Sequence, residues 1–201
     1  MDPLNLNSFK IMGQNFATLT FTDSVLAAQE RYGARRNWDG EENEPDRFLL
    51  TERENEFIAT LDHFYMATIG ENGWPYMQFR GGPRGFLKIL DDRHLAFADF
   101  RGNRQYLSVG NLNSGGKAML FLLDQARRMR LKIWATGEVL HPQDEGDLAA
   151  QLIDPEYRGK VERLIVFTVQ AYDWNCPQHI TPRYTEEEFQ KKSEAEVGCA
   201  A

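Results

Sequence analysis

Cysteine is scarce in this sequence. The 201 residues include two cysteines, Cys176 and Cys199, without a Cys-x-x-Cys motif. A disulfide framework or a structural zinc site would need more cysteine or histidine residues at closer spacing. One Cys-x-x-His pair, Cys176 with His179, is too little to indicate a metal site, and Cys176 is better interpreted as a small buried apolar group. We therefore expect a reduced, cytoplasmic protein that binds no metal.

Segments that would direct the chain to a membrane are also missing. No apolar run approaches the roughly 20 residues that a membrane-spanning helix requires. The first ten residues lack the basic start and the apolar core of a secretory signal. We expect no association with a membrane, and a content of 42% apolar and 26% charged residues is ordinary for a globular protein.

Positive charge is in deficit overall but concentrated in the middle of the chain. The formal net charge is −7. Between Arg80 and Lys132, eleven Lys or Arg residues accompany four Asp residues, a net of +7, so the rest of the chain carries −14. Nucleic acid would more often require a basic domain, so this pattern favours a small anionic ligand and no nucleic acid. Any single arginine here could equally be a solvated surface residue.

Capping patterns predict two helices near the N-terminus. Residues 22–24 (Thr-Asp-Ser) are suitable caps for a short helix over 25–32, and Gly33 is suitable to end it. Residues 51–54 form a capping box that predicts a helix of about twelve residues. The polar stretch 35–46 between them is interpreted as a solvated loop, which could also cover a site as a lid.

Short apolar or alternating segments predict a sheet in the rest of the chain. The predicted strands are residues 64–69, 74–79, 85–90, 95–98, 117–123, 129–139 and 163–171. Pro75 places the second strand at an edge or at a strand start. The Gly81-Gly82 pair indicates either a close backbone approach or a plain bulge.

The helices predicted outside this sheet are short. Tyr106, Leu107 and Val109 belong to an amphipathic segment and could face a core, and residues 142–153 resemble a short helix. We expect a single domain of 201 residues. Its parts are a helical and loop extension over about 1–62, a barrel over about 63–182 and a polar tail over 183–201.

A candidate anion site lies where an apolar segment runs through a glycine into a helix. Gly102, Asn103 and Arg104 are expected at the start of that helix, where unpaired backbone N–H groups favour an anion. Arg104 in the first turn is disfavoured by the helix dipole unless it has a negative partner. Arg84 and Lys88 add positive charge that could converge on the same place.

These residues resemble the flavin-phosphate region of the pyridoxamine 5'-phosphate oxidase-like family. In that family a strand lysine is followed by an aromatic-rich strand end and then by Gly-Ser-Arg-Lys at a helix start. Here Lys88 precedes FADFRGNRQ, and residues 102–105 match the last element. Asn103 replaces the serine, Gln105 replaces the lysine, and Ala98-Asp99 stands where the oxidases proper have Tyr-Thr. The resemblance covers about residues 57–139 and reappears at Trp174.

The resemblance implies a mainly β fold with peripheral helices, an FMN-binding split β-barrel. It further implies an FMN-dependent oxidoreductase that acts on a small-molecule redox substrate, as a homodimer with FMN at the interface. The residues expected at the phosphate are Arg84, Lys88, Asn103 and Arg104, and those nearer the ring are Gln78, Arg80 and Trp174. Further candidates for cofactor binding are Asp99, Gln105, Lys132, Trp134 and His179.

Lys132 and Trp134 share one face of a strand whose other face is apolar, which is typical of an interface anchored by tryptophan. In the pyridoxamine 5'-phosphate oxidase-like family, which the chain resembles, a polar residue on the matching strand reaches the flavin of the other subunit. Lys132 could alternatively be a solvated strand residue, and His179 a surface histidine.

Alternatives remain open at the level of the sequence. A split barrel could hold haem or a deazaflavin instead of FMN, or could serve as an interaction domain without a cofactor. The oxidases proper carry a Tyr-x-x-x-Arg-Pro element after the strand that matches residues 132–139. Residues 140–156 contain neither Tyr nor Arg, so we expect that the chain is not a true pyridoxamine phosphate oxidase.

Overall fold

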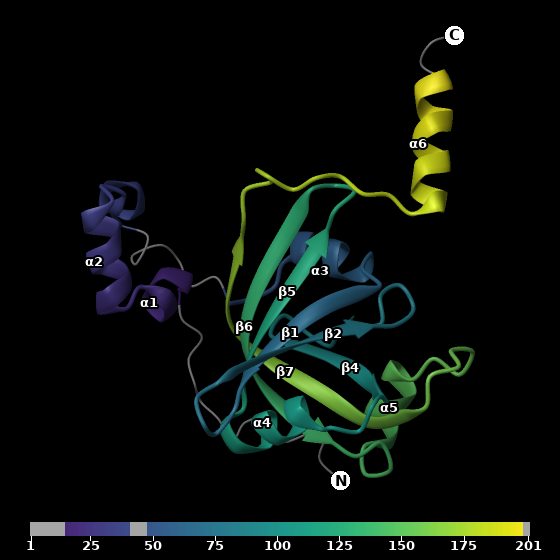
Figure 1. The fold of residues 1–201 in the computed structure, drawn as a ribbon. Helices are drawn as coiled ribbons and strands as arrows, with labels where there is room; N and C mark the ends of the chain where they lie inside the picture. Colours follow the sequence, from purple (N-terminus) through teal and green to yellow (C-terminus); the bar gives the residue numbers. More distant parts are fainter. Residues whose placement is uncertain (1–14, 41–47, 199–201) are drawn as a thin grey trace.

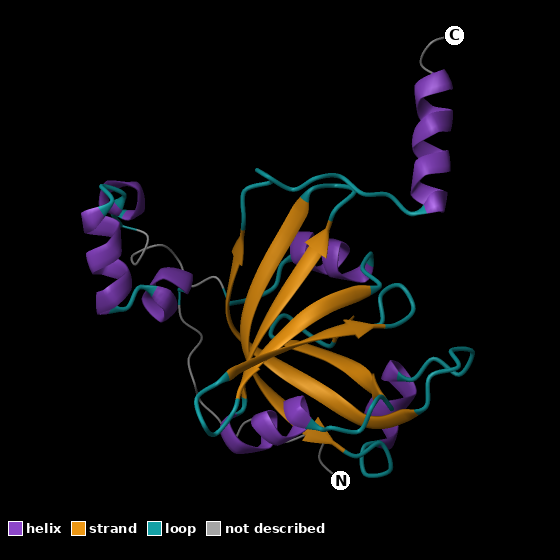
Figure 2. Cartoon of the chain, viewed as in Figure 1, coloured by secondary structure: helices purple, strands orange, loops and turns teal. Residues whose placement is uncertain are grey.

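The computed structural model describes residues 15–40 and 48–198. Within them, a seven-stranded antiparallel sheet has the strand order β2-β1-β5-β6-β7-β4-β3 (Figures 1 and 2). The strands are β1 His63–Ile69, β2 Pro75–Gly81, β3 Lys88–Ile89, β4 His94–Phe100, β5 Lys117–Asp124, β6 Met129–Leu140 and β7 Val161–Trp174. The predicted mainly β architecture is confirmed.

The sheet curls into a barrel that is split along one side. The long strand β7 pairs with β6 along one edge and with β4 along the other, and the β6–β7 register shifts at Trp134/Ala135. β2 and β4 are not hydrogen-bonded neighbours, yet Arg80 of β2 reaches Asp99 of β4. Side chains, instead of a backbone ladder, therefore bridge the opening between these two strands. This opening positions the candidate site.

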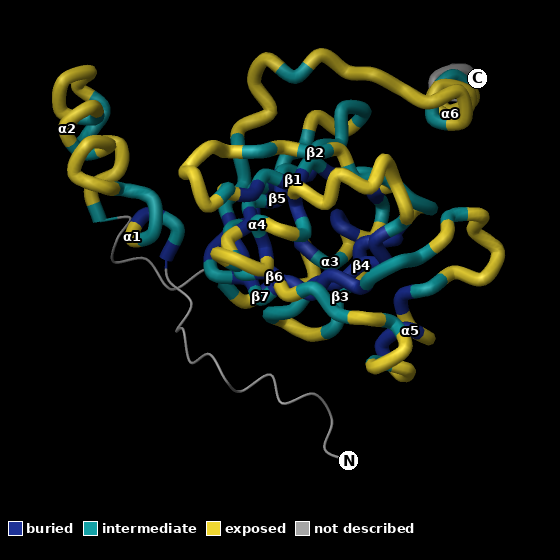
Figure 3. The backbone as a smooth tube through the Cα atoms, turned by 60° about the horizontal axis from the view of Figure 1, so that its bottom comes forward, coloured by how far each residue is buried: buried dark blue, intermediate teal, exposed yellow. Residues whose placement is uncertain are grey.

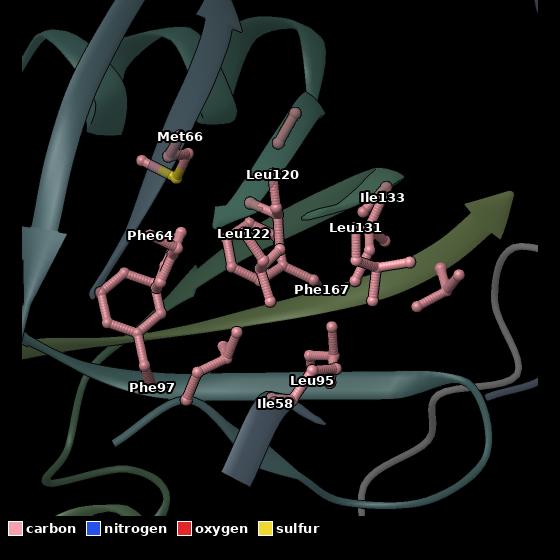
Figure 4. Close-up of a cluster of buried hydrophobic side chains, with 14 of the residues drawn as sticks. Ile58, Phe64, Met66, Leu95, Phe97, Leu120, Leu122, Leu131, Ile133 and Phe167 are labelled. Atoms are coloured by element: carbon pink, nitrogen blue, oxygen red, sulfur yellow. The ribbon is translucent and has the colours of Figure 1, made fainter. Parts of the chain in front are cut away.

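The core fills the barrel with side chains from the inward face of each strand. Phe64 of β1 meets Phe97 of β4 edge to face, and Phe97 stacks on Phe167 of β7 at a centroid distance of 6.0 Å. Leu131 and Ile133 of β6 complete this centre, as Figure 4 shows. Burial of each such side chain contributes roughly 1.5–3 kcal/mol to the free energy of folding. The interior of the barrel is therefore the main hydrophobic core of the protein.

Seven helical segments lie outside the barrel in the described residues. They are α1 Phe16–Thr20, α2 Asp23–Arg31, the 3-10 helix η2 Arg35–Trp38, α3 Glu52–Ala59, α4 Leu107–Gly115, α5 Gly146–Leu152 and α6 Glu186–Gly198. α3 has the predicted capping box but spans eight residues instead of about twelve, because the chain turns at Thr60 to enter β1. α2 and α6 stand apart from the barrel and are largely exposed (Figures 1 and 3). No described helix is long and apolar enough to span a membrane.

Two predicted segments differ from the structure. The strand expected over 85–90 is reduced to β3, because Phe86 and Leu87 turn into the core and Gly85 adopts φ +70° against the backbone of Ala59. The glycine pair before it is explained by packing. A Cβ at Gly82 would lie 2.6 Å from the ring of Phe86.

The helix after the candidate anion site also differs from its prediction. Tyr106 and Leu107 are exposed, and the helix buries Ser108 and Leu112 instead, because α4 begins later than expected. Cys176, expected to be buried, is exposed, because it follows the end of β7 instead of facing the core.

Candidate functional site

A cavity of about 220 Å³ occupies the opening between β2 and β4. β2 contributes Gln78, Phe79 and Arg80 to its wall, and β4 contributes Asp99. The loop 101–106 and Arg163 of β7 also line the cavity. Three parts of the chain that are distant in the sequence, namely β2, β4 with the loop after it, and β7, therefore meet at one polar cavity, which we name the arginine pocket.

A buried carboxylate organises the arginine pocket. Asp99 is 1% exposed, and Arg80 Nη1 donates to its Oδ1 at 2.6 Å. Arg163 donates to Oδ2 from Nε at 2.8 Å and from Nη2 at 2.6 Å. A carboxylate buried this deeply requires such partners, because desolvation of a charge without them is costly.

Arg80 retains capacity for a further hydrogen bond. Burial lowers the pKa of Arg80, and the carboxylate of Asp99 opposes that effect. Its Nε is buried and has no hydrogen-bond partner among the described residues. Because buried donors usually have a partner in native proteins, this atom is available to a bound group.

Tyr106 covers the second arginine. Its ring lies 4.9 Å from Cζ of Arg163, and its hydroxyl lies 3.5 Å from Glu162. Arg163 Nη1 also donates to Glu162 at 2.9 Å, and burial, which opposes charging, is outweighed by the Asp99 and Glu162 carboxylates, so the pKa of Arg163 is raised. Arg104 donates from Nε to the Tyr106 hydroxyl at 3.3 Å, and this contact raises the pKa of Arg104.

The loop over the pocket has an unusual backbone. Arg104 and Tyr106 have φ values of 64° and 56°, in the left-handed region. Asn103 holds the loop by accepting from the backbone N–H of Gln105 at 3.1 Å. Turns that contain left-handed residues can group successive backbone N–H donors into a concavity that binds anions. Arg104 thus precedes α4 instead of lying in its first turn, where the sequence had placed it.

The pocket has an excess of positive charge. Four guanidinium groups, those of Arg80, Arg101, Arg104 and Arg163, line it. The carboxylates that contact them are Asp99 and Glu162. The difference is two positive charges, close to the charge of roughly −1.5 to −2 on a phosphate monoester at neutral pH.

The structure brings together half of the predicted site residues. Those that line the arginine pocket are Gln78, Arg80, Asp99, Asn103, Arg104 and Gln105. Arg84 and Lys88 lie in an adjacent hollow of about 280 Å³, between β3, β4 and the end of α5. Within one chain these two cations therefore do not line the pocket that contains Arg104, because the chain turns at Gly85.

The remaining predicted residues lie elsewhere on the chain. Lys132 pairs with Asp173 at 3.0 Å on the outer face of the sheet, where Trp134 packs against Phe16 at 5.2 Å. Trp174 turns inward to α3, where its Nε1 donates to Glu54 at 2.6 Å. His179 has φ 63° in an exposed turn after β7.

Arg163, Arg101 and Tyr106 are pocket residues that the sequence did not single out. Arg163 lies at the start of a β-branched segment and belongs to no motif. The one signal in the sequence was a charged residue at the start of a strand that is otherwise largely buried. Its role depends on the pairing of Asp99 with Arg163 across β4 and β7, which is a long-range contact. Among the described residues, no three His, Cys, Asp or Glu side chains are grouped as metal ligands.

Comparison of the sequence with protein-family models identifies the family of this chain. The family model of pyridoxamine 5'-phosphate oxidase matches residues 50–174, and the chain belongs to this family. No curated protein matches the sequence significantly.

Solved structures with a similar fold are distant in sequence. An FMN-binding protein from Syntrophomonas wolfei has 17% identity and a TM-score of 0.49, covering 73% of this chain and 97% of its own. HupZ from Group A Streptococcus has 15% identity and a TM-score of 0.48, covering 67% and 100%. A Clostridium acetobutylicum protein related to general stress protein 26 has 18% identity and a TM-score of 0.45, covering 68% and 94%.

Proposed function

We propose that the protein is an FMN-dependent oxidoreductase that binds the FMN phosphate in the arginine pocket. The observation that carries this proposal is the pocket's excess of two positive charges beneath a left-handed loop. Membership of the family supports it. FMN supplies hydride or electron transfer, so the chain itself needs no nucleophile and no paired carboxylates.

The residues present fit this cofactor. Arg101, Arg104 and the backbone of the loop 101–106 would hold the phosphate by charge-assisted hydrogen bonds. Arg80 would direct its unpartnered Nε to the polar part of the ring system, and Gln78 is kept in place by Ser108 at 3.1 Å. Asp99 keeps Arg80 and Arg163 fixed, so that the pocket is ordered before the cofactor enters.

The cofactor site is completed by a second copy of the chain. A cavity of about 220 Å³ is smaller than most small-molecule sites, which occupy roughly 300–1,000 Å³. The outer face of strands β2, β1, β5 and β6 is apolar and in part exposed; Met77 is 65% exposed and Ile69 47%. The other residues on this face include Ala67, Met119 and Phe121. Burial of this face in a two-fold homodimer would remove apolar surface from water.

The homodimer also gives a role to two residues outside the pocket. Lys132 and Trp134 pair with Phe121 and Met119 on this same outer face. Lys132 Nζ lies 5.1 Å from the ring of Phe16 and 5.4 Å from that of Trp134, which holds it at the surface. We assign Lys132 to the partner's flavin, where it would offset negative charge.

Phosphate recognition is tested by comparing FMN with riboflavin. A charge-assisted contact is worth about 1.5–3 kcal/mol, so Arg104→Ala should weaken FMN binding about ten- to a hundredfold and riboflavin binding much less. Arg127→Ala is a matched control, because Arg127 is an exposed arginine held by Asp124 away from the pocket. Equal losses for FMN and riboflavin would contradict the assignment.

The shared site is tested by mass in solution and by FMN titration. Trp134→Asp should dissociate the dimer and weaken FMN binding, since a charge would enter the interface. Lys132→Ala should keep the dimer and alter the flavin environment. A monomeric Trp134→Asp protein that binds FMN with full affinity would show that each chain forms a complete site.

The substrate differs from that of the oxidases that name the family. Residues 140–156, which include α5, contain neither the Tyr nor the Arg that would hold a second phosphate. We therefore expect the pure protein loaded with FMN to leave pyridoxine phosphate unchanged. Efficient turnover of that compound, followed by the formation of pyridoxal phosphate, would overturn this part of the proposal.

A further inference from the structure

An N-terminal arm, residues 15–40 with α1, α2 and η2, extends from the barrel beside β6 (Figures 1 and 3). Aromatic side chains connect it to the sheet. Trp134 of β6 contacts Phe16 of α1, with ring centroids 5.2 Å apart. Phe21 lies between Phe16, at 5.9 Å, and Trp38 of η2, at 5.7 Å. The arm is therefore a folded extension that is anchored to the outer face of β6.

The part of the arm beyond α1 has little contact with the described parts of its own chain. Within them, α2 buries none of its nine residues and η2 buries none of its four. Isolated helices shorter than about 12–15 residues are marginal in water, and packing of an apolar face normally stabilises them. Val25 is 37% exposed and Tyr32 78%, and their spacing of about two helical turns places them on one face of α2. This exposed face favours a second surface on which the arm packs.

In the proposed homodimer, that second surface belongs to the partner copy of the chain. α1 lies over β6 and β7, at the boundary of the outer face that the dimer buries. Lys132 Nζ lies 5.1 Å from the ring of Phe16, and Lys132 is the residue assigned to the partner's flavin. A two-fold dimer with that contact places β6 opposite the partner's β2. The arm, which is continuous with β6 through Trp134 and Phe16, then extends along the partner's β2.

The arm reaches the opening of the partner's arginine pocket around the edge of the sheet. β2 is the terminal strand on its side of the sheet, and the pocket lies beyond it, between β2 and β4. Because α1 lies on the β7 side of β6, it projects past the edge of the partner's β2 instead of ending against the face of that strand. No residue of the arm lines the described pocket of its own chain.

We propose that the arm of each chain packs on the partner and closes the partner's flavin pocket to solvent, with Phe16 and Lys132 at its wall. This role of the arm depends on the proposed FMN function and homodimer. Exclusion of water by the aromatic arm strengthens the charge-assisted contacts of the cofactor inside the pocket. Loss of the arm contact should therefore expose the bound flavin to solutes and weaken the dimer, while the pocket itself stays intact.

The exposed face of α2 provides a direct test, in an arm variant that combines Val25→Asp with Tyr32→Asp. Both side chains are exposed on their own chain, so the variant should fold like wild type. Its dimer dissociation constant should rise at least about fivefold, because tyrosines are enriched among the residues that dominate interface affinity. Phe189→Asp is the control, since Phe189 is 60% exposed on α6 and lies outside the arm. Equal dissociation constants for wild type and the arm variant would overturn the proposal.

Mixed dimers, isolated with two affinity tags, show which pocket the arm closes. FMN is added at less than one per dimer, so that it occupies the intact pocket instead of one weakened by Arg104→Ala. In the first mixed dimer, one chain carries Arg104→Ala and the other carries the arm substitutions. In the second, one chain carries all of these substitutions and its partner is wild type. Iodide should quench the bound flavin of the second dimer several-fold more than that of the first, and equal quenching or the reverse order would overturn closure by the partner.

FMN titration of the same proteins separates this role of the arm from the FMN function. If the wild-type dimer bound no FMN, the FMN proposal would fall, and the dimer dissociation constants would still decide whether the arm packs on a second copy. If FMN bound but the arm substitutions changed neither the dissociation of the dimer nor the quenching by iodide, the role of the arm alone would fall.

Discussion

Two carboxylates are buried almost equally in this protein, but their surroundings are opposite. Glu54 is 2% exposed and Asp99 is 1% exposed. Glu54 accepts from neutral donors: the backbone and hydroxyl of Thr51, and Trp174 Nε1 at 2.6 Å. Asp99 lies between two guanidinium groups. One carboxylate joins a helix to the barrel, and the other keeps two cations in a pocket.

The difference shows which buried charge is structural. The Glu54 contacts close the capping box of α3 and dock it on the last strand, where Trp174 also packs against Phe57 at 4.9 Å. Arg53 lies 4.5 Å from the Trp174 ring and covers it. Every contact of Glu54 is explained by folding. The contacts of Asp99 order a cavity that keeps an unpartnered Arg80 Nε, which folding alone does not require.

Removal of the Asp99 charge should have the largest effect. Asp99→Asn leaves Arg80 and Arg163 side by side without their shared anion, and loss of one member of a buried ion pair costs about 3–5 kcal/mol. Urea unfolding should show this loss of stability. Added FMN should restore more stability to the variant than riboflavin does, because the phosphate supplies an anion to the same pocket.

Asp91→Asn provides the control for that experiment. Asp91 is an exposed carboxylate that caps the turn before β4, and it accepts from the backbone of Arg93 at 2.7 Å. Its variant should lose less stability than Asp99→Asn, and FMN and riboflavin should stabilise it to the degree seen in wild type. If Asp99→Asn were as stable as wild type, the two arginines would not depend on this carboxylate.

Glu54→Gln should have a smaller effect, confined to stability. Glutamine keeps one oxygen that accepts, so one of the bonds to Thr51 or Trp174 is lost or weakened, at a cost of about 1–3 kcal/mol. FMN affinity should stay within twofold of wild type, because Glu54 and Trp174 lie outside the arginine pocket. A large loss of FMN affinity at unchanged stability would mean that Trp174 serves the cofactor, as the sequence had suggested.

Local patterns in the sequence predicted the elements that local physics determines. The capping box over Thr51–Glu54, the edge position of Pro75 and the alternation along β6 are all set within a few residues, and the structure confirms them. The sequence predicted an anion site at the loop 101–106, which in the structure lines the arginine pocket, but it predicted the helix start too early. The left-handed φ values at Arg104 and Tyr106 could not be predicted, because Arg and Tyr rarely adopt this conformation.

Long-range contacts account for what the sequence did not reveal. Arg163 enters the pocket because β7 pairs with β4, which brings it opposite Asp99. Trp174 was expected near the ring of the cofactor, but the pairing of β7 with β6 leaves it facing α3. No spacing motif encodes either contact, since each depends on strand order. The dimer and the role of Lys132 stay predictions for the same reason.

The smallest expected effect is the change with pH in the stability that Glu54 contributes. Burial opposes ionisation of Glu54, but hydrogen bonds from Thr51 and Trp174 outweigh it and hold the pKa of Glu54 below its ordinary value. A carboxyl whose folded-state pKa lies below its unfolded-state pKa binds its proton more readily when unfolded. Its stabilisation is therefore complete above the ordinary pKa of a glutamate and is lost as the pH falls through the lower folded-state value.

Glu54→Gln should remove this part of the pH dependence. The difference in unfolding free energy between wild type and Glu54→Gln should be constant near neutral pH and should shrink in acid, below the ordinary glutamate pKa. Urea unfolding across that range measures it. Trp174→Phe should reduce part of the pH dependence of the unfolding free energy, because it removes one of the donors that stabilise the ionised carboxylate of Glu54. A difference that did not change with pH would show that Glu54 stabilises the fold without regard to its charge.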